Sequence, residues 1–415
     1  MLGTDAFLSL ARAAALKYGL PHLAVALVSH PIGGIDPAVL RGKAETIVDE
    51  VFDALTRDPA PPTPAAMAPA AVDVDAPDDL DAFQAWAMTE RSSDGLPVLP
   101  PTPERVARVL GGRAARRGEV VATLAPLDGR ATLEAIAVNA ALAGAGPEHL
   151  PVVLAAVRAL AEPRFNLNAV QTTTHPCTPL LIVNGPIARW LGISGGPNAL
   201  GNGHRANAVI GRAVRLVLQN VGGARPGLED RATLGHPGKF TYCLAENEAA
   251  SPWEPLHVER GFAPETSCVT VCGSEGPHNV NDHGSTTGEA LLFALAGTAA
   301  TTGNNNVYLS RGDPLVILGP EHARTMAASG WSKREVKRRL WERIRVRVDR
   351  FSAENRGRFA CIAPERFDGV PDDAEVSWCE SPDDLMLIVA GGPGKHSSVV
   401  PTFGTTRSVT IPIEA

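Results

Sequence analysis

A short pattern that recurs along the chain constrains its fold more than any other feature. Each copy is an apolar strand-like run, a turn built on proline and a helix-like segment, and the copies span residues 96–112, 179–196 and 314–331. Pro101, Pro186 and Pro320 fall near the expected first helical turn, where the missing N–H of proline costs nothing. Strand-like and helix-like patterns alternate elsewhere too, which predicts an α/β fold. We expect at least the last two copies to be equivalent units of a mixed, multi-layer body with internal pseudo-symmetry.

Three regions divide the 415 residues. Residues 1–57 carry a helix-like run, a strand-like run and a second helix-like run, which together make an incomplete β-α unit. A segment of this size cannot bury its own faces and must pack on something else. Residues 58–79 are rich in Pro, Ala and Asp, which predicts an extended linker. Residues 80–415 form the expected α/β body, which is predicted to carry the functional site.

Composition narrows the possible partners. The formal net charge is -7 and aromatic residues make up 5% of the chain. Both values argue against nucleic acid or an anionic membrane as the main partner, because phosphate binding needs clustered positive charge and bases stack on aromatic rings. No apolar run is long enough to span a bilayer, and no secretion signal is expected. Six cysteines without a CxxC pair favour a reducing cytoplasm and free thiols.

Two helices have the clearest patterns. Residues 206–221 place apolar side chains at i, i+3, i+4 and i+7, and Gly222 and Gly223 follow as a stop signal. The second helix begins at Ser332, which fits a capping box with Glu335. Its many Lys and Arg residues predict a solvated basic face. The alternative is a surface for an anionic ligand or an acidic partner subunit.

Residues 170–284 concentrate the side chains that can move protons, attack carbon or bind metal. His175 precedes an apolar strand, which is a favourable place for a site on an α/β sheet. Cys177 follows two residues later. It can act as a nucleophile only if a histidine or a helix N-terminus lowers its pKa, and otherwise it is an inert buried thiol. Glu246 and Glu248 follow a strand and alternate onto one face.

His257 and Glu259 form a second group of interest. If residues 256–260 are extended, the two side chains point the same way and make a usual general-base pair. The alternative is a structural ion pair of Glu259 with Arg260 or with another arginine. Both hypotheses are compatible with the sequence.

A loop over residues 276–284 contains His278, Asp282 and His283. Asp282 can orient a neighbouring imidazole or ligate a metal beside it, although the spacing matches no standard zinc pattern and Asn and Asp are common in turns. We therefore keep a catalytic role for His283 and a substrate-binding role for Asp282 as predictions, and assign no metal ligand.

The segment 384–398 is an apolar strand that runs into a glycine-rich loop ending in Lys395, His396 and Ser397. Such loops let backbone N–H groups approach an anion. The Walker pattern is absent because His396 stands where Ser or Thr should follow the lysine. The three residues are therefore predicted to bind an anionic substrate group, a carboxylate, phosphate or thiolate.

Several long phrases resemble the UGSC-type family, bacterial proteins named for a motif with selenocysteine or cysteine and often labelled thiol-disulfide oxidoreductases. They include THPCTPLLIVNGPIARWLGI, SPWEPLHVERGF and VAGGPGKHSSVVPTFG, and the resemblance covers most of the body and residues 5–34. It implies thiol- or selenol-dependent chemistry. The family's naming motif lies upstream of the first residue here, and no cysteine precedes Cys177. The nucleophile is then expected from another polypeptide or from Cys177.

Three hypotheses follow. The leading one is an enzyme that carries out thiol- or selenol-dependent redox or transfer chemistry on a small anionic or thiol-containing metabolite, with His175, Cys177, His257, Glu259 and His283 as catalytic groups. One alternative is a metal-dependent hydrolase or lyase with His and carboxylate ligands. The other is a non-catalytic subunit that completes its N-terminal unit on a UGSC-motif subunit or on a second copy, as a dimer. The cofactor stays unidentified. All enzyme readings require His175, His257, His283 and His396 to meet in one cleft.

Overall fold

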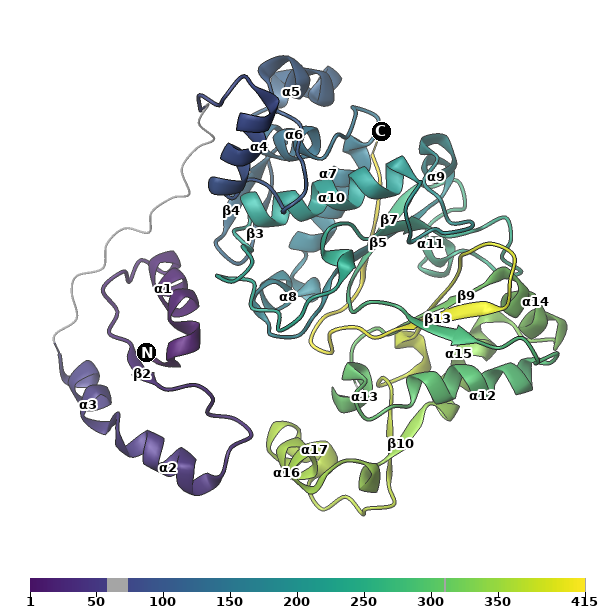
Figure 1. Ribbon diagram of the computed structural model, residues 1–415. Coiled ribbons are helices and arrows are strands. Elements are labelled where there is room, and N and C mark those ends of the chain that lie inside the picture. Colours follow the sequence, from purple (N-terminus) through teal and green to yellow (C-terminus); the bar gives the residue numbers. More distant parts are fainter. Residues whose placement is uncertain (58–73, 310, 415) are drawn as a thin grey trace.

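The computed structural model describes residues 1–57, 74–309 and 311–414, so most of the predicted linker lies outside the described residues. The N-terminal unit and the body are drawn in purple and in blue to yellow in Figure 1. The fold is α/β, as expected, with helices and several mixed sheets. None of the described helices is both long and apolar enough to cross a membrane.

The N-terminal unit is a β-α-β arrangement followed by two helices. Its strands β1 and β2 pair in parallel with Gly3 opposite Leu27. The elements are β1 (Leu2–Thr4), α1 (Leu8–Lys17), β2 (Ala26–Val28), α2 (Pro37–Glu45) and α3 (Val48–Thr56). The single helix expected after residue 37 is broken at Thr46 and Ile47. Arg231 of the body contacts this unit, donating to the carbonyl of Ala6.

Two four-stranded sheets form the centre of the body. The first has the order β14-β7-β5-β6, and the second has the order β12-β9-β13-β8. The first sheet contains β5 (Thr178–Asn184), β6 (Cys243–Ala245), β7 (Cys268–Ser274) and β14 (Val409–Pro412). The second contains β8 (His278–Asn281), β9 (Leu315–Leu318), β12 (Met386–Val389) and β13 (His396–Val400).

The two sheets have the same connectivity. In the first, β5 pairs in parallel with β6 and antiparallel with β7. In the second, β9 pairs in parallel with β12 and antiparallel with β13. A proline starts the helix after each central strand, in α9 (Pro186–Leu191) and α14 (Pro320–Ala328). The last two copies of the sequence pattern are therefore equivalent in topology. The first copy is not, because residues 96–100 form no strand and α5 begins at Pro103 rather than at Pro101.

Each sheet takes its fourth strand from the other half of the chain. β8 follows β7 but pairs with β13, and β14 follows β13 but pairs with β7. The two crossing segments meet side by side, where Ser274 and Thr402 form an isolated antiparallel bridge. The backbone N–H of Glu275 donates to Pro401 O, and that of Phe403 donates to Gly273 O, both at 2.9 Å.

The body has four layers, helices outside and two sheets inside (Figure 1). Apolar side chains from both sheets make one core between them, with Leu180 and Ile182 on β5 and Leu315 and Ile317 on β9. On the outer side of the first sheet, one apolar cluster joins side chains of β5 and β7 with those of α4 (Leu80–Thr89), α5 (Pro103–Leu110), α6 (Leu133–Leu142), α7 (Leu150–Ala161), α8 (Leu167–Thr172) and α10 (Arg205–Asn220). A second apolar cluster joins side chains of β9 and β12 with those of α12 (Gly288–Ala299), α13 (Asn305–Leu309), α14, α15 (Lys333–Arg343), α16 (Ala353–Ile362) and α17 (Pro364–Phe367).

The best-patterned helix confirms its prediction. α10 covers Arg205–Asn220 and buries its apolar side chains against α6 and α7, and the chain then turns at Gly223 with φ +82°. Two small antiparallel pairs complete the described body, β3 (Val120–Leu124) with β4 (Gly129–Thr132) and β10 (Arg345–Arg347) with β11 (Glu375–Ser377). Gly129 of β4 lies so close to the end of α10 that an added Cβ would be 1.7 Å from Val221 O.

Candidate functional site: a charged cavity around Arg260

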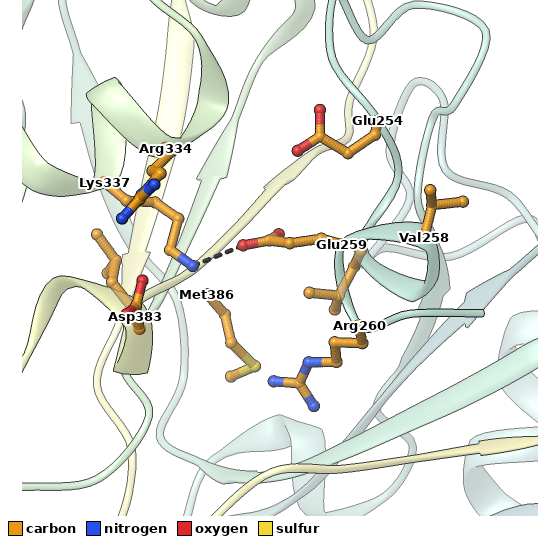
Figure 2. A pocket seen from close by; sticks show the side chains of 10 residues that line it. Glu254, Val258, Glu259, Arg260, Arg334, Lys337, Asp383 and Met386 are labelled. Carbon is orange, nitrogen blue, oxygen red and sulfur yellow. Dashed lines mark hydrogen bonds and ion pairs between the residues drawn. The ribbon is translucent and has the colours of Figure 1, made fainter. Parts of the chain in front are cut away.

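A cavity of about 510 Å³ is lined by residues of both halves of the body. Its walls come from the segment around α11 (Leu256–Glu259), from α15 and from the turn Pro382–Asp384, and Met386 of β12 also lines it. The charged lining residues are Glu254, Glu259, Arg260, Arg334, Lys337 and Asp383. Figure 2 shows these side chains arranged around the hollow, with Lys337 directed at Glu259.

Glu259 is held between two lysines of α15. Its Oε1 lies 2.6 Å from Lys337 Nζ and its Oε2 lies 2.8 Å from Lys333 Nζ. Burial alone raises the pKa of this carboxyl, but the charges and hydrogen bonds of the two lysines outweigh it and leave the pKa lowered. Glu259 is therefore a fixed carboxylate. Lys333 and Lys337 are buried, so the prediction of a wholly solvated basic face on α15 is wrong for these two residues.

The expected pairing of His257 with Glu259 is wrong. The segment Leu256–Glu259 is a short helix rather than an extended strand, and residues two apart on a helix diverge by about 200°. His257 is completely buried, and its Nε2 faces Pro264 O at 3.3 Å. The predicted alternative, an ion pair of Glu259, is present, but the partners are lysines rather than an arginine.

Arg260 has no acidic partner within ion-pair distance in the described part of the chain. Its Nη1 donates to Thr410 Oγ1 at 2.9 Å, and its Nη2 donates to Ser408 Oγ at 2.6 Å. Burial lowers the pKa of the guanidinium, although Asp313, Cys272 and Glu259 act in the opposite direction. Arginine stays charged at neutral pH even so. A partly buried guanidinium held only by neutral hydroxyls has unused capacity to bind an anion.

A second cavity, of about 540 Å³, adjoins the first, because Arg260 and Asp383 line both. Arg407 lies in its wall and is neutralised by Asp313 and Asp384, each 2.8 Å from Nη1. Ser408 links this group to Arg260, since its hydroxyl donates to Asp313 Oδ2 at 2.5 Å while it accepts from the arginine. The orientation of the Arg260 guanidinium is thus fixed by a hydrogen-bonded chain.

Glu246 and Glu248, whose side chains were predicted to share one face, do lie on the same side and contact the same asparagine. Asn184 Nδ2 donates to Glu246 Oε2 at 2.8 Å and to Glu248 Oε1 at 3.2 Å. Glu246 also accepts from the backbone N–H of Leu256 at 2.8 Å, which ties β6 to the start of α11. Burial raises the pKa of Glu246, and its Oε1 has no hydrogen-bond partner among the described residues.

His175 lies elsewhere, at the crossing segments. Its Nε2 is 2.6 Å from Glu275 Oε1, and its ring packs on Phe403 with centroids 5.2 Å apart. No local pattern pointed to Glu275, which is one hundred residues away. Cys177 is buried nearby, and burial raises its pKa to about 12 even though Lys239 acts to lower it. The thiol is therefore protonated at neutral pH, which disfavours the predicted nucleophile.

The remaining predicted residues gather at the β8–β13 side of the second sheet. His283 and His396 face each other with Nε2 atoms 3.4 Å apart, and Lys395 Nζ donates to His283 O at 3.0 Å. Asp282 uses its side chain to accept from the N–H groups of Gly284 and Ser285. Residues 278–281, expected in a loop, form β8 because they pair with β13.

Ser397 is buried rather than available to a substrate in this structure. Its Oγ is 2.7 Å from His322 Nδ1, and it accepts from Gly319 N–H at 3.1 Å. His322 Nε2 faces the carbonyl of Asp282 at 3.0 Å and so carries the proton there, which leaves Nδ1 to accept from the serine. Burial lowers the pKa of His322, in agreement with a neutral ring.

The predicted sites do not form one centre. Of His175, His257, His283 and His396, only the last two contact each other, and none of the four lines either cavity. In the residues that the structure describes, no group of three or more His, Cys, Asp or Glu side chains is placed to hold a metal ion. Sequence reasoning missed Arg260 as a site residue because its hydroxyl partners lie about 150 positions further on.

The fold and the cavity define an α/β protein with a charged cavity lined by two topologically equivalent halves. Residues 1–57 of the chain match the model of the UGSC family. The cavity residues lie outside that matched region. No curated protein and no solved structure matches the chain.

Proposed function

We propose that the body is a small-molecule enzyme that binds an anionic metabolite in the cavity at Arg260. The observation that carries the proposal is the guanidinium itself, which faces both cavities and is bonded to Thr410 and Ser408 instead of to a carboxylate. A carboxylate, phosphate or sulfonate can make the charge-assisted pair that the described residues leave unmade.

The charges around Arg260 suit a ligand that also has a positive end. Among the described residues, the side chains of Arg334, Glu254 and Asp383 also form no ion pair, whereas Lys337 is neutralised by Glu259. Two unpaired cations and two unpaired carboxylates thus line one cavity. An amino acid or a small amino-thiol presents both signs of charge and is the ligand class we favour.

The thiol- or selenol-dependent chemistry implied by the family resemblance needs a nucleophile from outside the cavity wall. No cysteine lines either cavity, and Cys361 is the exposed one of the six. We therefore propose that the reactive sulfur or selenium belongs to the substrate or to another polypeptide. The cavity would then bind and orient the anionic group, with Arg260 as its main contact.

Isothermal titration with L-cysteine, glutathione, phosphate and sulfate tests the proposal. We expect at least one probe to bind, and Arg260→Gln to weaken that binding tenfold or more. Arg189→Gln is the matched control, because Arg189 is an exposed arginine outside both cavities. Conversion of the bound probe is then followed by NMR. Equal binding by Arg260→Gln, or no binding of any probe to the wild type, contradicts the proposal. Binding of L-cysteine or glutathione without conversion contradicts a reaction at the sulfur of the substrate itself.

The N-terminal unit supports a second candidate, a subunit that docks on a second copy of the chain. Val48, Phe52 and Leu55 of α3 are exposed by 58%, 66% and 80%, and their spacing puts them on one helix face. A two-stranded sheet is marginal without further packing. We expect a dimer by light scattering and a monomer for Phe52→Glu, with Leu234→Glu, an exposed body residue, as control. A monomeric wild type contradicts this candidate.

A further inference from the structure

Two imidazoles from different strand ends meet on the second sheet, away from the Arg260 cavity. His396 is the first residue of β13, and His283 follows the end of β8, whose Asn281 is the register partner of His396. The rings are nearly perpendicular, at 81°, with centroids 5.2 Å apart. Both side chains are exposed, so an ion from solvent can reach them.

The distance between the two rings suits a shared metal ion better than a hydrogen bond. The Nε2 atoms are 3.4 Å apart. Hydrogen bonds donated by N–H are usually 2.9–3.0 Å long, so a ring-to-ring hydrogen bond here is a long one. Two histidine nitrogens that each lie about 2.0–2.1 Å from a tetrahedral zinc ion are separated by roughly 3.3 Å. The observed separation therefore already matches a pair of ligands.

The hydrogen bonding of His396 prepares its ring for this role. Its Nδ1 lies 3.1 Å from Asn279 Oδ1, which can only accept, so Nδ1 carries the proton. The Nε2 atom is then unprotonated, with its lone pair free. Histidine ligands of metals are commonly oriented in this way by an acceptor on the other ring nitrogen.

We infer that His283 and His396 bind a divalent transition-metal ion, with water completing the coordination. Imidazole pairs favour Zn²⁺, Ni²⁺ and Cu²⁺ over Mg²⁺ or Ca²⁺. Lys395 places an ammonium nearby through its bond to His283 O, and this charge opposes the cation. The ion is held by two side chains, so exchange with solvent is easy and the coordination positions left to water are open to a ligand atom.

Titration of the full-length protein with ZnCl₂ and CuCl₂ alone tests the inference. Cys361→Ser serves as the common background, because an exposed thiol can itself bind these ions. We expect one equivalent to bind, and His283→Ala and His396→Ala each to weaken it tenfold or more. His278→Ala is the matched control, since His278 is exposed at the start of β8 and lies opposite Val399 rather than His396.

Two further variants separate a ligand role from loss of structure. Asn279→Ala should lower the affinity for the ion while leaving both imidazoles in place. Lys395→Gln should raise that affinity, because it removes a nearby positive charge. The electron paramagnetic resonance spectrum of bound Cu²⁺ should report two nitrogen ligands in the background protein. The inference is overturned by an absence of binding, by binding that either histidine variant retains in full, or by a copper spectrum without nitrogen coupling. None of these results bears on Arg260.

Discussion

Lys239 reaches both carboxylate oxygens of Asp230, at 2.7 and 2.6 Å. Arg215 of α10 pairs with the same carboxylate at 3.0 Å, and the side chains of Asp230 and Arg215 are each 7% exposed. One acid thus pairs with two cations beside Cys177, and its removal leaves both without an ion-pair partner among the described residues.

We therefore expect Asp230→Asn to lower the free energy of unfolding by about 3 kcal/mol or more, the usual result of breaking a buried ion pair from one side. Urea unfolding followed by tryptophan fluorescence measures this. Glu119→Gln breaks the exposed pair with Arg116 and should change stability little. Similar losses in the two variants would contradict the burial argument.

Asp230 should also contribute to the loss of folding stability at acid pH. Burial raises the pKa of Asp230, but Lys239 and Arg215 outweigh it and leave the pKa below the ordinary aspartate value. A lowered pKa stabilises the folded state above the unfolded pKa, and this stabilisation is lost as pH falls through the folded pKa. The stability gap between wild type and Asp230→Asn should therefore narrow on acidification. Unfolding curves at a series of acid pH values measure the gap, and a constant gap contradicts the assignment.

Glu246 should show the opposite dependence. Burial raises its pKa, so its protonated form is favoured in the folded state, and that advantage disappears as pH rises through the folded pKa. Glu246→Gln resembles the protonated carboxyl and keeps an oxygen for Asn184 and Leu256. We expect the variant to gain stability relative to wild type as pH rises from acid to neutral. Equilibrium unfolding at acid and neutral pH decides this, and a relative loss on raising pH would be inconsistent with the shift.

Native thiol reactivity should be confined to one cysteine. Cys177, Cys243, Cys272 and Cys379 are buried, and burial raises the pKa of each to about 12. Cys268 is buried as well. Ellman's reagent should titrate one rapid thiol in the native protein, none in Cys361→Ser, and six after unfolding of the wild type. Rapid modification of Cys177 would restore it as a nucleophile.

Close backbone packing should make Gly129 intolerant of a side chain. The added Cβ of Gly129→Ala would clash with the backbone carbonyl of Val221, which cannot rotate away as a side chain can. Overpacking of this kind costs about 1–3 kcal/mol, and the upper end applies here. Thermal unfolding should show this loss, whereas Gly118→Ala, which meets open space, is the matched control. Equal melting temperatures would show that the strand can shift.

Local patterns predicted the elements well where one helix face or strand determines them. The periodicity of α10 and the capping serine of α15 are examples, and the strand–proline–helix copies gave β5 and β9 their correct places. Strand pairing between segments far apart in the sequence could not be predicted from local patterns. Residues 278–281 look like a turn because of their Asn content, yet the ladder with β13 makes them a strand.

The site depended even more on distant contacts. His175 was recognisable, but its partner Glu275 follows β7, the neighbouring strand in the sheet, and lies one hundred positions further along the chain. Arg260 looked like an ion-pair residue because nothing nearby in sequence reveals the hydroxyls of Ser408 and Thr410. The predicted pairing of His257 with Glu259 was wrong because this segment forms a single helical turn, so the two side chains point in different directions. The turn begins after Pro255, where the buried Glu246 accepts from the backbone N–H of Leu256.

The exchange of β8 and β14 between the two halves has a consequence for how the body folds. Each half depends on a strand that the other half's crossing segment delivers, so no cut in the chain between them leaves two autonomous pieces. The first sheet cannot be finished until residues 409–412 have been synthesised, because β14 is one of its two outer strands. Completion of this sheet therefore waits for β14, and pairing between segments so far apart in the sequence is slow.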